Sequence, residues 1–360
     1  IGGSFFIETG SLYAPVSGGV PPYDAISDQP TGRNTTYFIK TPATGVTEEL
    51  YRGDAVNPLE LGNLVVDRTG GYEVKLTSSA TRANESVIMD VNGNASVLSG
   101  TLNQNLFTIR TWGAITNNGR MGTWHPGVTP SRAQIQLVEN PSLTLNTGSD
   151  AVFGNVQINV TPPSVLMLTS DVYIERMEFV KGLIYLRGFN LRVDNMWNLE
   201  AGIFQNVPAT SYLRVFNSGR SGSSMIYTDG KAGDGGLTLR VAANSQAENE
   251  NNILNNFGPV TFPVGFTPDG GTTLYFRPAQ LVVKNYSSPG YITIRPVTGA
   301  LQTTNQGGGE VLQHYWRVSH SGFTVLPTVS YRFYYRNQTG VTGVDLSTTI
   351  NETGYVPGKV

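Results

Sequence analysis

Residues 154–193 read GNVQINVTPPSVLMLTSDVYIERMEFVKGLIYLRGFNLRV. Apolar side chains occupy nearly every second position of this stretch, and Pro, Gly, Asn or Asp interrupts each run after a few residues. Alternation with a period of two predicts strands with one buried face, and the interruptions predict turns between them. The stretch therefore indicates a chain that forms the same short strand again and again.

Apolar strand positions also recur at a regular spacing along the chain. Steps of 21 residues relate Ile135/Leu137, Val156/Ile158 and Met177/Phe179. Steps of 23 residues relate Leu143/Leu145, Leu166/Leu168 and Phe189/Leu191. Upstream, steps of 22 and 21 residues relate Val66, Ile88 and Ile109, and the next step, of 26 residues to Ile135, contains the sequence RMGTWHPG. We interpret that sequence as a loop inserted into one repeat.

A repeat of about 22 residues, built from short strands and polar turns, predicts a right-handed parallel β-helix, in which stacked coils bury a shared core. A leucine-rich repeat has a similar length, but its consensus is absent. An antiparallel sandwich with evenly spaced hairpins is the alternative, because its strands also alternate with a period of two. The expected inward positions are Ile135, Leu143, Val156, Leu166, Met177 and Leu191. The expected solvated outward positions are Gln157, Glu175, Arg176, Glu178, Arg187 and Arg192.

Composition supports an all-β protein and excludes several functional classes. The 360 residues include 42 Gly and 20 Pro, while only 14% are charged, as expected for many strands and turns. A net charge of -2 without a basic cluster argues against a nucleic-acid partner and against binding to an anionic membrane surface. No apolar run is long enough to span a membrane directly. The absence of cysteine excludes disulfides, zinc knuckles and thiol catalysis.

Three regions are expected along the chain. Residues 1–58 are predicted to form an N-terminal cap or β segment, residues 59–256 the parallel β-helix, and residues 257–360 an antiparallel β-sandwich that is incomplete at its C-terminus. The third region contains the strand-like segments TLYFRPAQLVVKNY, GYITIRPV, HYWRVSH and TVSYRFYYRN. The chain begins with Ile and ends in GYVPGKV, so we interpret it as a piece of a longer protein.

The densest acidic group of the predicted β-helix is Asp171, Glu175 and Glu178. Polysaccharide lyases and hydrolases on a β-helical fold need clustered carboxylates, or acidic calcium ligands with a basic proton acceptor. Strand alternation, however, places Asp171 and Glu175 on one face and Glu178 on the other. A solvated flank is therefore favoured over a catalytic group.

Other chemical motifs favour structural roles. DVNGN (90–94) and TDGKAGDGG (228–236) offer oxygen ligands for calcium, but Asn-Gly and Asp-Gly predict hairpin turns more directly. His314 and His320 share one strand face and could form a metal pair, whereas His125 is distant in sequence; a single surface or packing role is favoured for each of the three. There is no GxSxG nucleophile motif. We therefore assign no catalytic, cofactor-binding or metal-ligating residue, and expect no cofactor.

Aromatic residues of the C-terminal third offer the best indication of a partner. Trp316, Tyr331, Phe333, Tyr334 and Tyr335 lie close together in sequence. Such rings stack on sugar faces, and the neighbouring arginines are Arg317, Arg332 and Arg336. Alternation favours the other interpretation, in which Tyr331, Phe333 and Tyr335 are buried in the sandwich core and only Tyr334 faces outward.

Several longer phrases resemble a known family over roughly residues 60–330. They are GAITNNGRMG, FGNVQI, LTSDVYIERMEFVKGLIYLRGFNLRV, FGPVTFPVGFTPDGGTTLYFRP and HYWRVSHSG. With their strand, Asn-Gly, strand cadence, the FPVG motif at 262–265 and the Tyr-Trp pair at 315–316, they look like the large surface proteins that Bacteroidota-type bacteria export by type IX secretion. The C-terminal sorting domain of that family is not found here.

The resemblance implies an extracellular location, at the cell surface or secreted, and roles in adhesion, gliding or surface display. We therefore predict a non-catalytic structural or adhesin segment of a larger bacterial protein, whose partners are surface glycans or other cell-surface and secretion proteins. A β-helical polysaccharide lyase or hydrolase is the first alternative. A phage or viral fibre segment is the second.

Overall fold

The computed structural model is all-β in the parts that it describes, and those parts fall into two compact units. The described residues are 5–7, 35–38, 48–52, 59–68, 73–78, 88–105, 107–123, 135–137, 142–148, 151–160, 164–197, 224–241, 260–268, 274–284, 286, 288–299 and 314–333. The first unit comprises Ile1–Ile184 and Leu191–Glu200, and the second Tyr185–Asn190 and Ala201–Val360. No described segment forms an apolar helix of membrane-spanning length.

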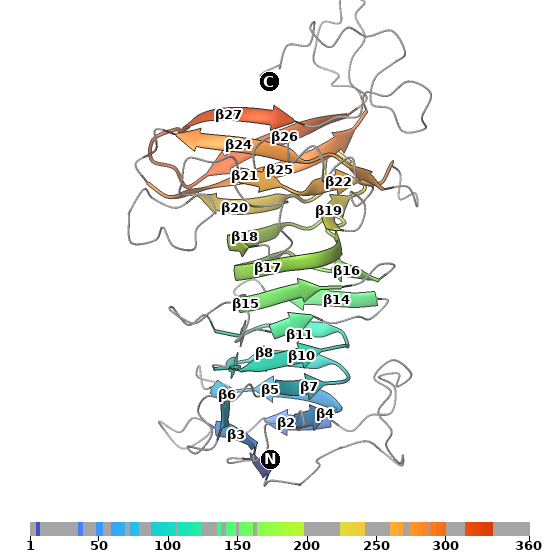
Figure 1. The fold of residues 1–360 in the computed structure, drawn as a ribbon, viewed down its shortest axis with the longest axis vertical. Coiled ribbons are helices and arrows are strands. Elements are labelled where there is room, and N and C mark those ends of the chain that lie inside the picture. The colour runs from blue at the N-terminus through green and yellow to red at the C-terminus, as the bar shows by residue number, and fades with distance from the viewer. Residues whose placement is uncertain are drawn as a thin grey trace, which may run out of the picture. The chain divides into compact units, whose positions relative to one another are not determined.

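The first unit consists of three ladders of parallel strands, stacked in successive layers in Figure 1. The β7 ladder contains β4 (Leu59–Leu61), β7 (Ile88–Val91), β10 (Thr108–Thr111), β13 (Ile135–Leu137), β15 (Val152–Asn159), β17 (Val172–Tyr185) and β18 (Leu191–Trp197). The β8 ladder contains β2 (Thr35–Phe38), β5 (Asn63–Asp67), β8 (Ala95–Ser99), β11 (Ile115–Asn117), β14 (Ser142–Thr147) and β16 (Val165–Leu168).

The β9 ladder contains β1 (Phe5–Ile7), β3 (Glu48–Arg52), β6 (Glu73–Ser78), β9 (Thr101–Asn103), β12 (Arg120–Met121) and the first halves of β15, β17 and β18. The chain visits the ladders in a fixed order, so that β7, β8 and β9 are followed by β10, β11 and β12 in the same three ladders. Each circuit therefore places one strand in every ladder, directly beside its counterpart from the previous circuit.

The register confirms most of the predicted repeat. Ile135 pairs with Val156, and Val156 with Met177, while Leu143 pairs with Leu166. The inward positions whose side chains are described are all buried, with exposed fractions of 1% or less: Ile135, Val156, Leu166, Met177 and Leu191. Burying such a side chain contributes about 1.5–3 kcal/mol, so the stacked apolar rows are a main source of stability in this unit.

Three of the predicted register steps are wrong. Leu191 pairs with Val172 in the β9 ladder instead of following Leu168, because β17 and β18 run through a corner without a break. Val66 lies in the β8 ladder and Ile88 in the β7 ladder, so these two residues are not counterparts. Ile109 pairs with Met89 instead of Ile88. The expected inserted loop is RMGTWHPG (120–127), but its first two residues form strand β12 (Arg120–Met121), and its residues from 124 onward lie outside the described part of the chain.

Amide side chains hold the corners where the chain passes from one ladder to the next. Between the β7 and β8 ladders, Asn94 N–H donates to Asn63 Oδ1 (2.8 Å), and Ala114 N–H donates to Asn94 Oδ1 (2.9 Å). Between the β8 and β9 ladders, the buried Asn117 donates from Nδ2 to the carbonyl oxygen of Val152 (3.0 Å). The Asn92–Gly93 turn thus joins two parallel ladders and does not form the predicted hairpin.

The corner between β9 and β10 uses a glutamine. Gln104 is fully buried, donates from Nε2 to the carbonyl oxygen of Thr123 (2.6 Å) and accepts from the Thr123 N–H through Oε1 (2.7 Å). Its amide therefore binds the backbone of the next circuit as a neighbouring strand would. In this cysteine-free chain, hydrogen-bonded corners connect successive circuits without covalent links.

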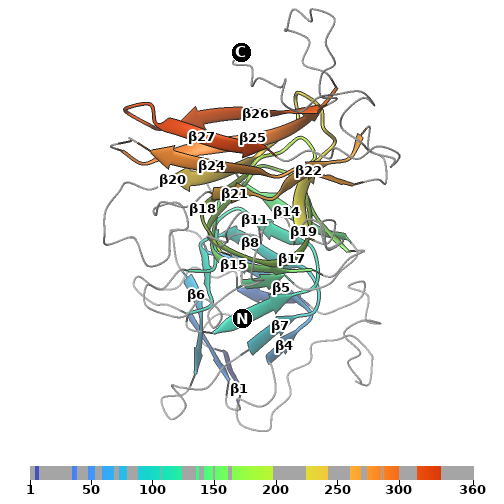
Figure 2. The same ribbon diagram turned by 45° about the horizontal axis from the view of Figure 1, so that its top comes forward.

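The second unit is mainly antiparallel. β25 (Gly290–Thr298) pairs antiparallel with β20 (Leu237–Val241) on one side and with β26 (His314–Ser321) on the other. A separate three-stranded sheet contains β21 (Val260–Phe262), β24 (Ala279–Lys284) and β27 (Thr328–Phe333). A parallel pair, β19 (Ser224–Thr228) and β22 (Val264–Phe266), continues into β23 (Tyr275–Phe276). Figure 2 shows β25 and β26 as long neighbouring strands. Antiparallel pairing already involves β20, which precedes residue 257, the predicted start of the antiparallel region.

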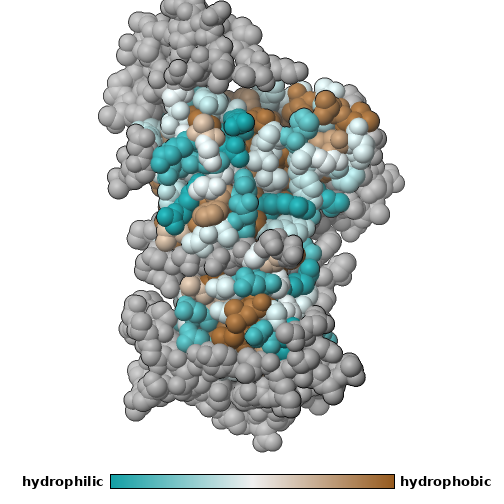
Figure 3. Space-filling model, turned by 180° about the vertical axis from the view of Figure 1, so that it is seen from behind, coloured by the Kyte–Doolittle hydropathy of each residue, from teal (hydrophilic) through white to brown (hydrophobic). Residues whose placement is uncertain are grey.

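Exposed large apolar side chains are few in the described residues: Leu98, Val318, Val325, Leu326 and Tyr331. The face in Figure 3 accordingly shows mainly hydrophilic and neutral residues with small brown groups among them. Four of these five residues belong to the second unit, near β26 and β27.

Candidate functional site

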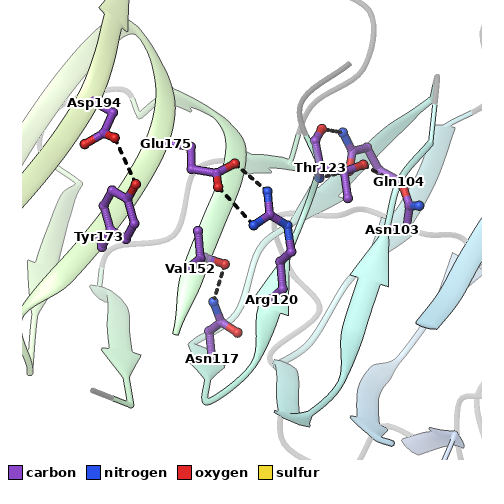
Figure 4. Close-up of polar contacts among 9 residues, drawn as sticks. All are labelled: Asn103, Gln104, Asn117, Arg120, Thr123, Val152, Tyr173, Glu175 and Asp194. Atoms are coloured by element: carbon purple, nitrogen blue, oxygen red, sulfur yellow. Dashed lines mark hydrogen bonds and ion pairs between the residues drawn. The ribbon is translucent and has the colours of Figure 1, made fainter. Parts of the chain in front are cut away.

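Polar side chains line the outer face of the β9 ladder and bind one another across strands (Figure 4). Both guanidinium Nη atoms of Arg120, on β12, donate to the carboxylate of Glu175, on β17; the Nη1–Oε1 distance is 3.0 Å. The two residues are 55 positions apart in sequence, and their side chains are about one-third exposed. At this exposure an ion pair contributes about 1 kcal/mol or less, so its main effect is to join the strands.

The next strands along the same ladder carry a second polar group. Tyr173 donates from its hydroxyl to Asp194 Oδ2 (2.9 Å), and the Arg192 guanidinium carbon lies 4.3 Å from the centre of the Tyr173 ring. Arg192 Nε is 3.5 Å from Asp194 Oδ1. Burial, followed by the charge of Asp194 and the hydrogen bond to it, raises the pKa of Tyr173 to about 12. The phenol therefore stays protonated and acts as a hydrogen-bond donor at neutral pH.

The outer face of the β7 ladder is also internally paired. Arg110 donates from Nε and Nη2 to the two carboxylate oxygens of Asp90, at 2.7 and 2.6 Å, and lies 5.3 Å from the Trp112 ring centre. Further along, Gln157 Nε2 donates to Glu178 Oε2 (2.9 Å). These contacts follow the strand register, which places Asp90 beside Arg110 and Gln157 beside Glu178.

Three of the expected solvated positions are in fact buried. Gln157 is 9% exposed, Arg176 3% and Glu178 0%. Burial lowers the pKa of Arg176, and the nearby Glu178 carboxylate opposes that shift. Arg176 lies between the buried Ile174 and Met177, where the chain turns a corner. Period-two alternation assigns a residue to the inside or the outside and therefore does not describe such corner positions.

The three acidic residues of the predicted acidic group have different surroundings. Asp171 is exposed, Glu175 is bound by Arg120, and Glu178 is buried against Gln157. Glu175 and Glu178 lie on the outer faces of two different ladders, because the corner at Arg176 interrupts the alternation, so the expected opposite faces and the expected exposure of Glu178 are both wrong. A reaction that needs two carboxylates around one bond has no shared space for them in this group.

The calcium candidates bind protein groups. Asp90 is paired with Arg110, as described above. Asp229 accepts a hydrogen bond from the Tyr185 hydroxyl and lies 3.5 Å from Lys231 Nζ, while Asp234 Oδ2 accepts the Lys231 backbone N–H (2.8 Å). Within the described ranges, no three His, Cys, Asp or Glu side chains are grouped as metal ligands.

Tyr185 and Tyr227 stack against each other beside Asp229, with ring centres 4.8 Å apart and planes 6° apart. Burial is the largest cause that raises the pKa of both phenols, and it brings that of Tyr227 to about 12. The hydrogen bond to Asp229 raises the pKa of Tyr185 further. This aromatic pair connects β17 to β19 and was not singled out from the sequence.

The two described histidines have different neighbours. His314 is buried, with its ring 4.6 Å from Trp316 and 5.6 Å from Phe266. His320 is exposed, and its ring lies 6.3 Å from Phe323. These contacts fit the predicted single surface or packing roles better than a metal pair, and His125 lies outside the described residues.

The aromatic candidates are partly buried between the two antiparallel sheets. Trp316 stacks on Phe333 at 4.7 Å and donates from Nε1 to the carbonyl oxygen of Arg277 (2.8 Å). Tyr331 lies 5.1 Å from Phe333 but is 48% exposed, so its predicted burial is wrong. Outside the described part of the chain lie Tyr334, Tyr335, Arg336 and the side chain of Arg332.

Sequence analysis missed Arg120, Tyr173 and Asp194 as members of one polar surface. These residues meet only because their strands belong to the same ladder; Arg120, for example, is 55 positions away from Glu175 in sequence. The repeat itself holds the necessary signal, since extending the register by one strand places Tyr173 beside Arg192. Reading the outward residues strand by strand would have identified the row.

Comparison with known proteins gives no match: no family model fits the chain, and no curated protein or solved structure is significantly similar to it. The resemblance to type IX secretion cargo therefore remains a prediction.

Proposed function

We propose that this chain is a non-catalytic structural or adhesive segment of a larger extracellular protein. The first unit would be a right-handed parallel β-helix and the second a β-sandwich. One observation carries the proposal: on the outer faces of the first unit, charged side chains bind partners on other strands of the same ladder, as in Asp90–Arg110 on adjacent strands and Arg120–Glu175 across the intervening β15. Groups arranged in this way strengthen the stack and are engaged before any substrate arrives.

The register supports the β-helical part of the proposal. A chain that places one strand in each of three parallel ladders per circuit buries its apolar rows only when circuits stack, as in a solenoid. Such an architecture suits a spacer or display element. The proposed location is the cell surface or the extracellular medium, with surface glycans or secretion proteins as partners, and these points rest on the sequence resemblance.

The test is incubation of the purified chain with a panel of polysaccharides, with and without calcium. Retained sugar and new chain ends are measured in the same samples. We expect no new ends, with or without retention. New ends that disappear in Asp171→Asn, Glu175→Gln or Glu178→Gln, but persist in the matched control Glu73→Gln on β6, would contradict the proposal and favour a polysaccharide-degrading enzyme.

A further inference from the structure

Three strands of the second unit present a face that is rich in arginine and hydroxyl groups. Odd-numbered residues of β25 and β26 share this face with even-numbered residues of β20, because directly opposed residues of an antiparallel pair point to the same side. We call it the arginine face; its members are Thr238, Arg240, Tyr291, Thr293, Arg295, Tyr315, Arg317, Ser319 and Ser321, together with the buried Val297 opposite Tyr315. The opposite side of β25 carries the buried Ile292 and Ile294.

Two arginines stand directly opposite each other on this face. The register pairs Arg295 of β25 with Arg317 of β26. Like charges at opposed positions of adjacent strands destabilise a sheet. Arg317 is exposed and Arg295 partly buried. Burial and, next, the charge of Arg317 lower the pKa of Arg295, while Asp234 opposes the shift.

Counter-charges from the protein compensate this pair only in part. Asp234 is itself buried and accepts the backbone N–H of Lys231. No ion pair among the described residues involves Arg240, Arg295 or Arg317. The first unit offers a contrast, because there Arg110 and Arg120 each bind a carboxylate through two nitrogens. Among the described residues, the arginine face therefore carries one exposed cation, Arg317, and two partly exposed cations, Arg240 and Arg295, that form no ion pair.

The other members of the face indicate what kind of anion fits. Thr238 and Thr293 hydroxyls lie 2.8 Å apart, and the register continues this row to Ser319. Tyr291 and Tyr315 are partly exposed, so each ring offers an amphipathic surface beside the arginines. Guanidinium groups bind carboxylate and sulfate, hydroxyl groups bind sugar hydroxyls, and aromatic rings cover sugar faces. A chain of anionic sugars satisfies all three.

From this arrangement we propose that the arginine face binds an anionic glycan, with Arg295 and Arg317 holding one carboxylate or sulfate group between them. The proposal extends the adhesive role suggested above. It uses residues of the second unit alone, so it holds or fails independently of the β-helical first unit.

Binding is tested with the full chain on immobilised polygalacturonate, dextran sulfate, neutral dextran and single-stranded DNA, at increasing salt concentrations. We expect retention on an anionic glycan, weakening as salt rises, and none on dextran. Retention on polygalacturonate alone assigns a carboxylate, and retention on dextran sulfate a sulfate. Absence of retention on both anionic glycans, or stronger retention on DNA than on either, would overturn the proposal.

Arg317→Gln and Arg295→Gln test the two residues directly. Losing one charge-assisted contact should weaken retention about tenfold or more. Lys75→Gln on β6 of the first unit removes the same charge and should change retention by less than about twofold. An equal loss in Lys75→Gln would show that net charge alone controls binding, which overturns the proposal.

Thermal unfolding provides a readout that does not depend on retention. Without polysaccharide, Arg317→Gln should unfold at the same temperature as the wild type or slightly higher, because a like-charge contact is relieved. The same concentration of glycan should raise the wild-type midpoint more than that of the variant, because the variant binds about tenfold more weakly. An equal rise in both would overturn the assignment. New chain ends in these samples would contradict the non-catalytic function while leaving the anion site intact.

Discussion

The two units of this protein use their charged side chains differently. In the first unit, outward charges bind one another, as Arg110 binds its register partner Asp90 and Arg120 binds Glu175 across the intervening strand β15. In the second unit, Arg295 and Arg317 oppose each other, and apolar side chains such as Leu326 are exposed. A surface whose polar groups are already paired suits a structural element, whereas unpaired cations and exposed apolar groups suit contact with a partner.

The largest effect is expected from a charge in the stacked core of the first unit. Val156→Asp places a carboxylate between the buried Ile135 and Met177 and should cost about 3–5 kcal/mol. Urea unfolding followed by circular dichroism measures the loss. Val152→Asp on the same strand faces outward beside Arg120 and is the matched control. Equal destabilisation in both variants would contradict the assignment of inward and outward faces.

A smaller effect is expected at the corner between β9 and β10. Gln104→Ala removes both hydrogen bonds to the Thr123 backbone in a buried site and should cost about 2–4 kcal/mol. Gln136→Ala, at a half-exposed position of β13, should change the free energy of unfolding by less than about 0.5 kcal/mol. If the two variants lose equal stability, amide corners do not connect the circuits.

Paired glycine substitutions compare the two units directly. A Cβ at Gly113 would lie 2.4 Å from the carbonyl carbon of Gly93 on the preceding circuit, so Gly113→Ala must move backbone and should cost about 1–3 kcal/mol. A Cβ at Gly188, in the second unit, would meet nothing within 4 Å. Gly188→Ala should leave the unfolding midpoint nearly unchanged. If Gly113→Ala also left the unfolding midpoint unchanged, successive circuits would not be in close contact at this position.

The smallest effect concerns alkaline pH. Because the pKa of Tyr173 is raised to about 12, its folded form keeps a proton that the unfolded chain loses near pH 10. Its contribution to stability is therefore complete below pH 10 and is lost as pH rises from 10 through 12. Spectrophotometric titration of tyrosine should show one late-ionising phenol fewer in Tyr173→Phe. An unchanged titration curve would contradict the hydrogen bond to Asp194.

The sequence predicted the repeat best where circuits have equal length. Steps of 21 residues link Ile135, Val156 and Met177, and the structure confirms these pairs. The prediction failed at Val66 and Leu191. Upstream, 30 residues separate the paired Leu59 and Met89, and near Leu191 the separation of paired residues in the β9 ladder falls to 19, as between Val172 and Leu191. A single period cannot follow corners of variable length.

The candidate sites were less predictable than the fold. Alternation placed Glu175 and Glu178 on opposite faces, whereas the corner at Arg176 turns both outward; it also treated outward residues as solvated, although Gln157 and Glu178 are buried. The opposition of Arg295 and Arg317 depends on an antiparallel register across a 22-residue sequence separation. Sequence patterns indicate which side of a strand a residue occupies, but its neighbour is determined by strand pairing.

The central claim is that successive circuits of the first unit stack in parallel and in register. Cysteine pairs test it directly, because the chain has no native cysteine. Ser96 and Thr116 are outward, partly exposed partners on β8 and β11. Neighbouring strands lie about 4.8 Å apart, within the range that a disulfide spans, whereas an offset of two residues lengthens the separation beyond about 7 Å. Ser96→Cys/Thr116→Cys should therefore oxidise within one chain, and Ser96→Cys/Asn118→Cys should not. Cross-linking of the offset pair alone, or of both pairs equally, would contradict the stacked register.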